Sequence, residues 1–598
     1  MIDKILEIDD IRQSEQFLMP SSYQNNNSNR YEIYPSFNIE SRIHSGYTSL
    51  VERLLTNSTT IVFDGYIGVN WSFVKRQTEI AFQKEGKTIN WISIDDYLKE
   101  DQIIENLVSP YLGGDDPLFG KIYPGELSDF YELDRISELK IAPNSINIIF
   151  GSGAALAGEE FPIVYFDLPK NELQFRSRAG SVKNLGKSLP EDPKKQYKRF
   201  YFIDWVVLNK HKHRIFHRID FMVDEQRPDD INWLTGKDLR IELANMSSNA
   251  FRARPWFEPG IWGGQWIKNN IDGLNKTVKN YAWSFELIAP ENGIVLENNN
   301  LLMEVSIDCL LYFDNKAILG KAAKRFGHKF PIRFDFLDTI DGGNLSLQCH
   351  PSVAYTKEHF GEDFTQDETY YILESEPGAE VYLGFQENID KNTFRNALQS
   401  SFDENSTVDV KKYIQYFPAS KHDLFLIPNG TVHCSGRGNL VLEISATPYI
   451  FTFKMYDWLR PDLNGLPRPL NINRAFENLD FTRKGQVVND TLISTSKVLK
   501  EGTQWRIMEL STHQEHFYAI HRLEFQTCIN DNTNDQCLVM SLVEGESITV
   551  VTGGRRMQFN YAETFIIPAN AGSFLIENNG DSIAKVIKAF VKDSSCLL

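Results

Sequence analysis

The chain has 598 residues and a formal net charge of -18 at pH 7, with 42% hydrophobic and 24% charged residues. This length is too great for one hydrophobic core, so roughly two to four domains are expected. The acidic balance argues against a nucleic-acid partner or an anionic membrane surface, because either would need a basic patch.

The lack of an expected targeting signal and the cysteine usage indicate a cytoplasmic protein. No apolar run approaches the length of a membrane span. The first residues, 1–11, carry acids where a secretory signal would carry bases. The cysteines show no framework spacing, which suits a reducing cytoplasm better than a disulfide scaffold: Cys309, Cys349, Cys434, Cys528, Cys537 and Cys596.

The N-terminal third reads as a polar segment followed by an α/β domain. Residues 1–45 are polar, and 24–29 are expected to form a flexible loop. Over 46–195, short apolar runs alternate with helical stretches, which predicts a mainly parallel sheet. The expected strands are Thr60–Phe63, Thr88–Ile94, Ile146–Phe150 and Ile163–Phe166, and the expected helices include Phe73–Phe82 and Asp129–Leu139.

The turn Asp64–Trp71 lies where a phosphate-binding loop would follow the first strand. With Asp95-Asp96 and Arg176 further on, the layout resembles a P-loop nucleoside or sugar kinase. A phosphate loop needs glycines, a lysine and a Ser/Thr, and no Gly-Lys-Ser/Thr follows here. We therefore expect a degenerate kinase-like domain with a structural or regulatory role and no phosphotransfer.

Residues 196–249 are expected to connect the domains. Within them, Lys210–Arg214 and His217 suggest a metal site, but the neighbours are cationic and no carboxylate or thiolate is interspersed. The run is interpreted instead as a solvated basic face.

Four residues further on could share a metal ion. Gln348 and His350 are two residues apart on a predicted strand, Leu345 to His350, so both side chains project from the same face. Glu368 opens a β-rich run, and His433 follows the Pro428-Asn429-Gly430 turn. Two imidazoles, a carboxylate and an amide oxygen make a borderline site suited to Zn²⁺ and able to accept Co²⁺ or Mn²⁺.

These residues resemble the class I phosphomannose isomerases. That family supplies its zinc ligands from Q-x-H-P, E-x-x-Y-I-L and P-x-G-T-x-H segments. The matching segments here, with others that fit the family, are Gln348–Pro351, Glu368–Leu373, Pro428–His433, Pro259–Gly264, Trp283–Leu287, Leu442-Glu443 and Tyr456–Trp458. The resemblance covers roughly 250–598 and implies a zinc-dependent cupin enzyme that interconverts mannose 6-phosphate and fructose 6-phosphate.

The same resemblance divides the second half of the chain. Residues 250–470 are expected to form the metal-binding cupin barrel, with a helical insertion at Asn392–Ser401 and Val408–Tyr416. Residues 495–598 contain a pattern similar to Leu424–His433 but lack an equivalent of His433. They are expected to form a second cupin barrel without metal that serves packing and dimer contacts. A homodimer is left open.

The chemistry implied is proton transfer between C1 and C2 through an enediol, with the metal holding the enolate oxygen. Glu443 is the expected acid/base group, because a carboxylate on an apolar strand is costly to bury without a task. Lys454, which is also expected to be catalytic, and Arg460 are expected to bind phosphate, and Trp262 is expected to contact substrate. Two positions depart from the family: Gln366 replaces a lysine, and Lys454 replaces an arginine.

Two alternatives to the isomerase stay open. A cupin could bind metal for stability alone. A metal barrel joined to a degenerate kinase could also bind a sugar in a regulatory role without turning it over.

Overall fold

The computed structural model describes residues 8–23, 30–55, 58–114, 116–158, 160–446, 448–461, 465 and 468–597. The expected flexible loop at 24–29 lies outside these residues. The chain divides into two compact units. Unit 1 comprises Met1–Asn26, Tyr34–Met246 and Pro290–Asp314, and unit 2 comprises Asn27–Ile33, Ser247–Ala289 and Asn315–Leu598.

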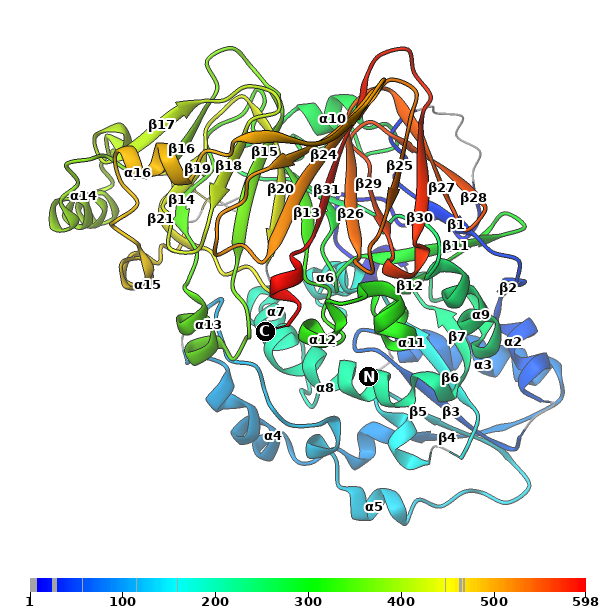
Figure 1. Cartoon of the computed structure of the whole chain (residues 1–598). Helices are drawn as coiled ribbons and strands as arrows, with labels where there is room; N and C mark the ends of the chain where they lie inside the picture. Colours follow the sequence, from blue (N-terminus) through cyan, green and yellow to red (C-terminus); the bar gives the residue numbers. More distant parts are fainter. Residues whose placement is uncertain are drawn as a thin grey trace. The chain divides into compact units, whose positions relative to one another are not determined.

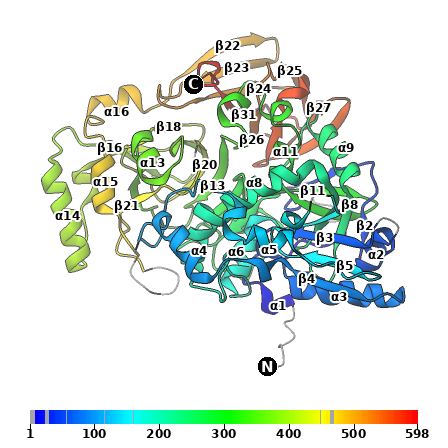
Figure 2. The same cartoon turned by 90° about the horizontal axis from the view of Figure 1, so that it is seen from below.

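Unit 1 is built on a seven-stranded sheet of order β2-β8-β7-β6-β3-β5-β4 (Figures 1 and 2). Its strands are β2 His44–Ser45, β3 Thr60–Gly65, β4 Ile89–Ser93, β5 Ile146–Phe150, β6 Ile163–Asp167, β7 Ile219–Asp224 and β8 Asn232–Thr235. The pairs from β4 to β7 are parallel, and β8 pairs antiparallel with both neighbours. The prediction of a mainly parallel α/β sheet is confirmed.

Short helices accompany this sheet. They are α1 Ile8–Ile11, α2 Tyr47–Leu54, α3 Trp71–Lys84, α4 Asp101–Val108, α5 Leu133–Ser137, α6 Lys170–Arg178, α7 Pro193–Arg199, α8 Trp205–Ile215 and α9 Gly236–Met246. The expected helix at 129–139 is shorter than predicted, since only α5 and a 3-10 turn form there. Phe63, Phe82 and Trp233 lie in the main core cluster, each at most 1% exposed.

Unit 1 extends beyond its expected limits at both ends. Strands β7 and β8 and helices α8 and α9 come from the expected connecting region, 196–249. A three-stranded sheet joins β1 (Ser36–Asn38), β11 (Gly293–Asn298) and β12 (Leu301–Ser306), although 290–314 was expected to belong to the metal-binding barrel. The segment is held in unit 1 because its backbone bonds acids at the ends of β6 and β7: Ser306 N to Asp167 (2.8 Å) and Glu304 N to Asp224 (2.9 Å).

The basic run Lys210–Arg214 is not the solvated face that we expected. His213 and Arg214 are exposed, but His211 and Lys212 are 3% and 1% exposed. Lys212 Nζ donates to Asp167 Oδ1 (2.7 Å) and to Ser306 Oγ (2.7 Å). A helix exposes only one side, so consecutive basic residues are divided between solvent and interior, where each buried charge needs a partner.

The first part of unit 2 contains two antiparallel sheets, of order β18-β15-β20-β13-β10-β9 and β17-β16-β19-β14-β21. The strands are β9 Trp256–Glu258, β10 Trp283–Leu287, β13 Arg333–Asp338, β14 Leu347–Cys349, β15 Asp367–Ser375, β16 Glu380–Phe385, β17 Ile414–Pro418, β18 Leu424–Ile427, β19 His433–Ser435, β20 Asn439–Ala446 and β21 Phe453–Tyr456. The arrangement is consistent with the cupin-like barrel that we expected.

Helices in unit 2 lie between these strands and after them. They are α10 Trp266–Asn270, α11 Asp308–Leu319 (whose first half belongs to unit 1), α12 Ala323–Phe326, α13 Val353–Phe360, α14 Lys391–Glu404, α15 Ile472–Asn478 and α16 Gln486–Thr491. Helix α14 confirms the first predicted insertion helix. The second, at Val408–Tyr416, is wrong: a single 3-10 turn leads into β17, where Tyr416 and Phe417 pair with β16.

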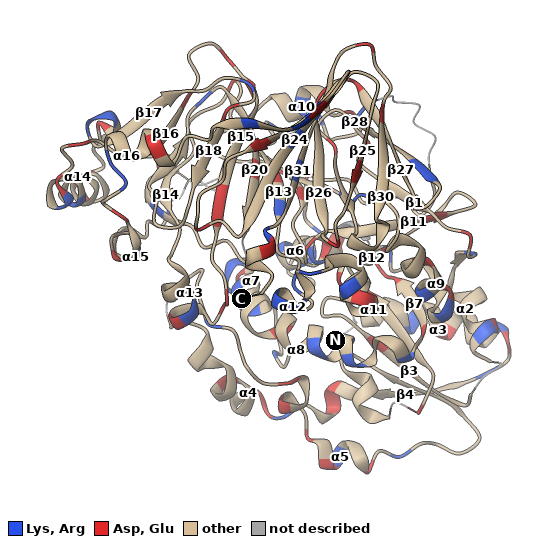
Figure 3. Ribbon diagram, viewed as in Figure 1, with Lys and Arg blue, Asp and Glu red and all other residues tan. Residues whose placement is uncertain are grey.

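The last part of unit 2 forms sheets of order β22-β23-β24-β31-β26-β29 and β25-β30-β27-β28. Their strands are β22 Ser496–Gly502, β23 Trp505–Leu510, β24 Tyr518–Phe525, β25 Cys528–Asn532, β26 Leu538–Glu544, β27 Ser547–Thr552, β28 Arg555–Asn560, β29 Thr564–Ile567, β30 Ser573–Asn578 and β31 Ala584–Val591. Residues of both sheets share one core cluster. Acidic and basic residues are interspersed along the ribbon (Figure 3). Among the described residues, none of the helices is both long and apolar enough to cross a bilayer.

Candidate metal centre

Three of the expected ligands meet between the two sheets of the first part of unit 2. Glu368 lies on β15 of the six-stranded sheet, His433 opens β19 of the five-stranded sheet, and His350 follows β14. One ligand atom from each lies within 4.8 Å of the others. His350 Nε2 is 3.0 Å and His433 Nε2 is 3.3 Å from the Glu368 carboxylate. The structure thus brings together residues 83 positions apart in the sequence.

Backbone carbonyls orient both imidazoles. The Nδ1 atom of His350 lies 3.0 Å from Phe451 O, and that of His433 lies 2.9 Å from Thr431 O. Because a carbonyl only accepts, each Nδ1 carries a proton, which leaves Nε2 as the ring atom that faces Glu368 and could bind a metal ion. This tautomer is the one that a metal ligand requires.

Buried polar atoms without partners show that the three residues fit a metal ion. Among the described residues, His350 Nε2 and Glu368 Oε2 have no hydrogen-bond partner, although both residues are at most 1% exposed. Burial raises the pKa of Glu368, but the two imidazoles outweigh it and hold the pKa well below its usual range. An ionised carboxylate with two imidazoles is a donor set that Zn²⁺ and similar ions accept.

Two glutamines flank the three residues. Gln348, the fourth expected ligand, is the cross-strand partner of His433, and its amide nitrogen lies 3.3 Å from His433 Nε2. Amide nitrogen and oxygen are interchangeable by a flip, so the side chain reaches the centre in either orientation. Gln366 donates from Nε2 to Glu368 Oε1. It therefore positions the carboxylate from the place where the family's lysine was expected.

Glu443 lies on the same sheet face as Glu368 and is 8% exposed. Its cross-strand partners are Tyr370 on β15 and Asp335 on β13. Burial, then the charges of Asp335 and Glu368, raise the pKa of Glu443 well above its ordinary value. The pKa of Asp335 is raised for the same reasons, burial first and Glu368 next. A proton-holding carboxyl therefore lies beside the candidate metal centre.

Lys454 lies beside Gln348, as its cross-strand partner on β21. Its ammonium has no hydrogen bond or ion pair within the described part of the chain. Asp457 binds both Arg460 (2.7 Å) and Arg468, so two guanidinium groups share one carboxylate. Burial, Arg468 and Arg460 lower the pKa of Lys454 to about 8, against the opposing effect of Asp457. Such a cluster is suited to an anion.

Trp262 is buried (6% exposed), and its ring edge packs on Trp283 with centroids 4.3 Å apart. Its carbonyl accepts from Gly343 N (2.7 Å), in the turn Asp341–Gly343. A side chain at Gly343 would contact Arg460 Nη1 at 3.2 Å. Among the described residues, no hydrogen bond, ion pair or ring contact joins Trp262 to the three metal-site residues.

Sequence reasoning missed Asp335 and Tyr370. The pattern Arg333-Phe334-Asp335-Phe336 alternates charged and aromatic residues, which marks a strand with one polar face, and Tyr370 follows Glu368 at the same spacing. Both signals were present, but Asp335 lies outside the motifs that supply ligands, and Tyr370 occupies a variable position of the Glu368–Leu373 segment.

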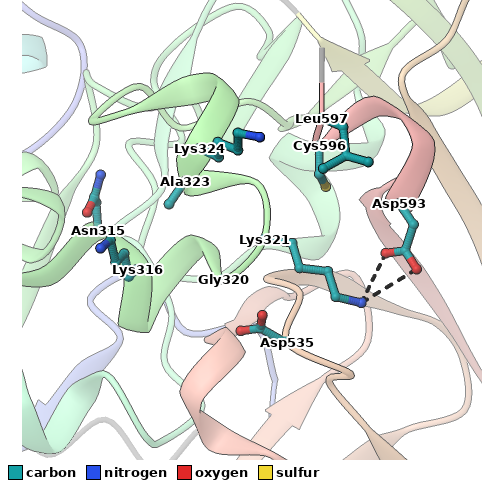
Figure 4. Close-up of a pocket in the computed structure, with 10 residues that line it drawn as sticks. All are labelled: Asn315, Lys316, Gly320, Lys321, Ala323, Lys324, Asp535, Asp593, Cys596 and Leu597. Carbon is teal, nitrogen blue, oxygen red and sulfur yellow. Dashed lines mark hydrogen bonds and ion pairs between the residues drawn. The ribbon is translucent and has the colours of Figure 1, made fainter.

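A separate hollow of about 670 Å³ lies elsewhere in unit 2 (Figure 4). Three lysines line it, and Lys321 pairs with Asp593 at 3.2 Å. None of the expected site residues lines this hollow, whose wall is formed by Asn315, Lys316, Gly320, Lys321, Ala323, Lys324, Asp535, Asp593, Cys596 and Leu597.

Comparison with known proteins gives one family model and several similar proteins. A family model described as "Domain of unknown function (DUF8485)" matches residues 46–248. Solved structures similar to this chain include mannose 6-phosphate isomerase from Bacillus subtilis (19% identity, TM-score 0.46, covering 56% of this chain and 98% of that one). A point variant of phosphomannose isomerase from Salmonella typhimurium gives 13% identity and a TM-score of 0.44, covering 57% of this chain and 99% of that one.

Curated relatives carry the same name. The mannose-6-phosphate isomerase of Streptococcus mutans is 24% identical over 326 residues, which are 54% of this chain and 94% of that protein. The "probable mannose-6-phosphate isomerase GmuF" of Bacillus subtilis is 25% identical over 324 residues, again 54% of this chain and 94% of that protein. Over about half its length, at low identity, the chain has mannose-6-phosphate isomerases as its relatives.

Proposed function

We propose that this protein is a zinc-dependent isomerase that interconverts an aldose phosphate and a 2-ketose phosphate, with mannose 6-phosphate and fructose 6-phosphate as the expected pair. The observation that carries the proposal is the convergence of His350, Glu368 and His433, in which two buried atoms of the described residues make no hydrogen bond. The names of the relatives support it. A bound Zn²⁺, or Co²⁺ or Mn²⁺ in its place, would stabilise negative charge on the substrate oxygen as the enediol forms.

The chain's own residues would perform the proton transfer. In its ionised form, Glu443, which is buried beside Glu368, is placed to take the proton from one of the two reacting carbons and return it to the other. Gln366 would hold the Glu368 carboxylate in orientation, since it donates to Oε1. Lys454, with Arg460 and Arg468 around Asp457, would receive the phosphate.

A coupled assay on metal-analysed protein, with mannose 6-phosphate, fructose 6-phosphate and the unphosphorylated sugars, tests the activity. In Glu443→Gln, turnover should fall by at least a hundredfold, the range expected for loss of a general acid or base, while metal content and sugar binding persist. The metal-site residues make the matched comparison, because His433→Ala should lose the metal as well. Equal exchange of the C2 proton with solvent by wild type and Glu443→Gln would refute the acid/base role.

A second function, sugar binding without turnover in a regulatory role, is favoured by unit 1. In the turn after β3, the backbone N–H groups that would face a nucleotide phosphate already bond protein acids: Gly65 N to Asp64 (2.6 Å) and Asn70 N to Glu225 (3.0 Å). Lys75 lies over the ring of Trp91, 5.6 Å from its centroid. We propose that this kinase-like domain has lost phosphotransfer. If the protein is a sensor, wild type will bind a sugar phosphate without exchanging its C2 proton.

A further inference from the structure

A polar row crosses the sheet face that carries Glu368. Asp335 on β13, Glu443 on β20 and Tyr370 on β15 are successive cross-strand partners in the six-stranded sheet. Tyr370 lies two residues after Glu368, so both side chains project from the same face. The ring of Tyr370 meets that of His433 edge-on, with centroids 5.8 Å apart. The row therefore forms a wall of the candidate metal centre.

Two members of this row have no hydrogen-bond partner in the described part of the chain, and the hydroxyl of one of them is fully buried. The Tyr370 side chain is fully buried, and its hydroxyl has no hydrogen-bond partner among the described residues. Asp335 is 6% exposed, and in the same described set its carboxyl makes no hydrogen bond or ion pair. Arg333, two residues away on the same face, donates instead to Pro448 O (2.7 Å). A buried polar group without a partner costs stability, so it points to a ligand that completes it.

Asp338, on the same strand, shows the contrasting case of a structural acid. It is fully buried, and its oxygens accept from Ile267 N (2.9 Å) and Ile340 N (3.0 Å). Its carboxyl is satisfied by the fold, whereas that of Asp335 is not.

We propose that Asp335 and Tyr370 are specificity-determining residues that bind hydroxyl groups of the substrate's sugar chain. The inference rests on the proposed function and adds an orientation to it. A carboxyl group and a phenol each bond a sugar hydroxyl, but neither carries the positive charge that phosphate binding favours. The hydroxyl-bearing carbons of the sugar therefore lie along β13 and β15, and the phosphate group lies toward Lys454 on β21, in the opposite sheet.

Binding calorimetry tests the assignment without requiring turnover. Wild type, Tyr370→Phe and Asp335→Asn would be titrated with mannose 6-phosphate and with its 3-deoxy and 4-deoxy analogues. Each substitution should weaken binding of the parent sugar about tenfold, the usual effect of one lost hydrogen bond. It should leave unchanged the binding of the analogue that lacks the partnered hydroxyl. Asp338→Asn is the control, because loss of a structural acid should change the affinity for all three sugars alike. Elemental analysis of each variant should show that the metal is retained.

The outcomes separate the two proposals. If wild type binds the sugars but both variants weaken all three equally, or not at all, the hydroxyl assignment is overturned and the isomerase proposal stands. If wild type binds none of the sugar phosphates, both are overturned. If one variant binds the parent sugar more weakly but binds one deoxy analogue as wild type does, the hydroxyl missing from that analogue is the partner of the substituted residue.

Discussion

Metal binding by His350, Glu368 and His433 should stabilise unit 2 by an amount that can be worked out. An ion present at a hundred times its dissociation constant adds about 2.7 kcal/mol to the folded state. Unit 2 has roughly 330 residues, and unfolding entropy near 2.1 cal/mol/K per residue gives about 0.7 kcal/mol/K. Saturating Zn²⁺ should therefore raise the melting temperature of unit 2 by about 4 °C.

Differential scanning calorimetry with and without a chelator measures this shift. His350→Ala should abolish it, because the ion would lose one of its two imidazole ligands. His359→Ala is the matched control, since His359 is an exposed histidine on α13 of the same unit. A zinc-dependent rise of equal size in His350→Ala would refute the site, and so would the absence of a rise in wild type.

Three further predictions concern other groups. Because the pKa of Lys454 is lowered to about 8, chiefly by burial, its charge is present below pH 8 and is lost as the pH rises. KM for a sugar phosphate should then rise several-fold from pH 7 to pH 9, and Lys454→Arg should flatten that profile, because arginine stays charged; an unchanged profile would argue against a phosphate role. Lys212→Met should destabilise unit 1 by about 3–5 kcal/mol in urea unfolding, since Asp167 is left as an unpaired buried charge. The double variant with Asp167→Asn should lose less, and equal losses would contradict the pairing. Calorimetry with Mg²⁺–ATP should show no tight binding, whereas a micromolar dissociation constant would mean that unit 1 is an active nucleotide site.

Local patterns in the sequence were sufficient to predict four of the seven strands in the main sheet of unit 1. Apolar runs such as Ile146–Phe150 became parallel strands because such strands are buried on both faces. Val408–Tyr416 shows the limit of this reasoning. Its last residues, from Ile414 on, belong to β17 because they pair with β16 at the edge of the sheet, a tertiary effect that local propensity does not contain.

The candidate site was predicted where motifs fix the spacing, and missed where only cross-strand register does. Gln348, His350, Glu368 and His433 lie in recognisable segments, and the structure places them together. Asp335 reaches this face only through its pairing with Glu443, more than a hundred residues later in the sequence. In the same way, the burial of Lys212 depends on Asp167, whose position opposite α8 the helix sequence does not encode.

The chain passes from unit 1 to unit 2 and back, which affects both its folding during synthesis and the choice of fragments. Unit 1 is completed only by 290–314, after the chain has already contributed Ser247–Ala289 to unit 2. During synthesis, the hydrogen bonds from Glu304 N and Ser306 N to the acids at the ends of β7 and β6 can form only after residues 304 and 306 have been added. A fragment that stops at residue 248 would leave Lys170 without Asp308, its buried partner at 2.6 Å. Unit 1 is therefore best produced as a fragment that extends through Asp314.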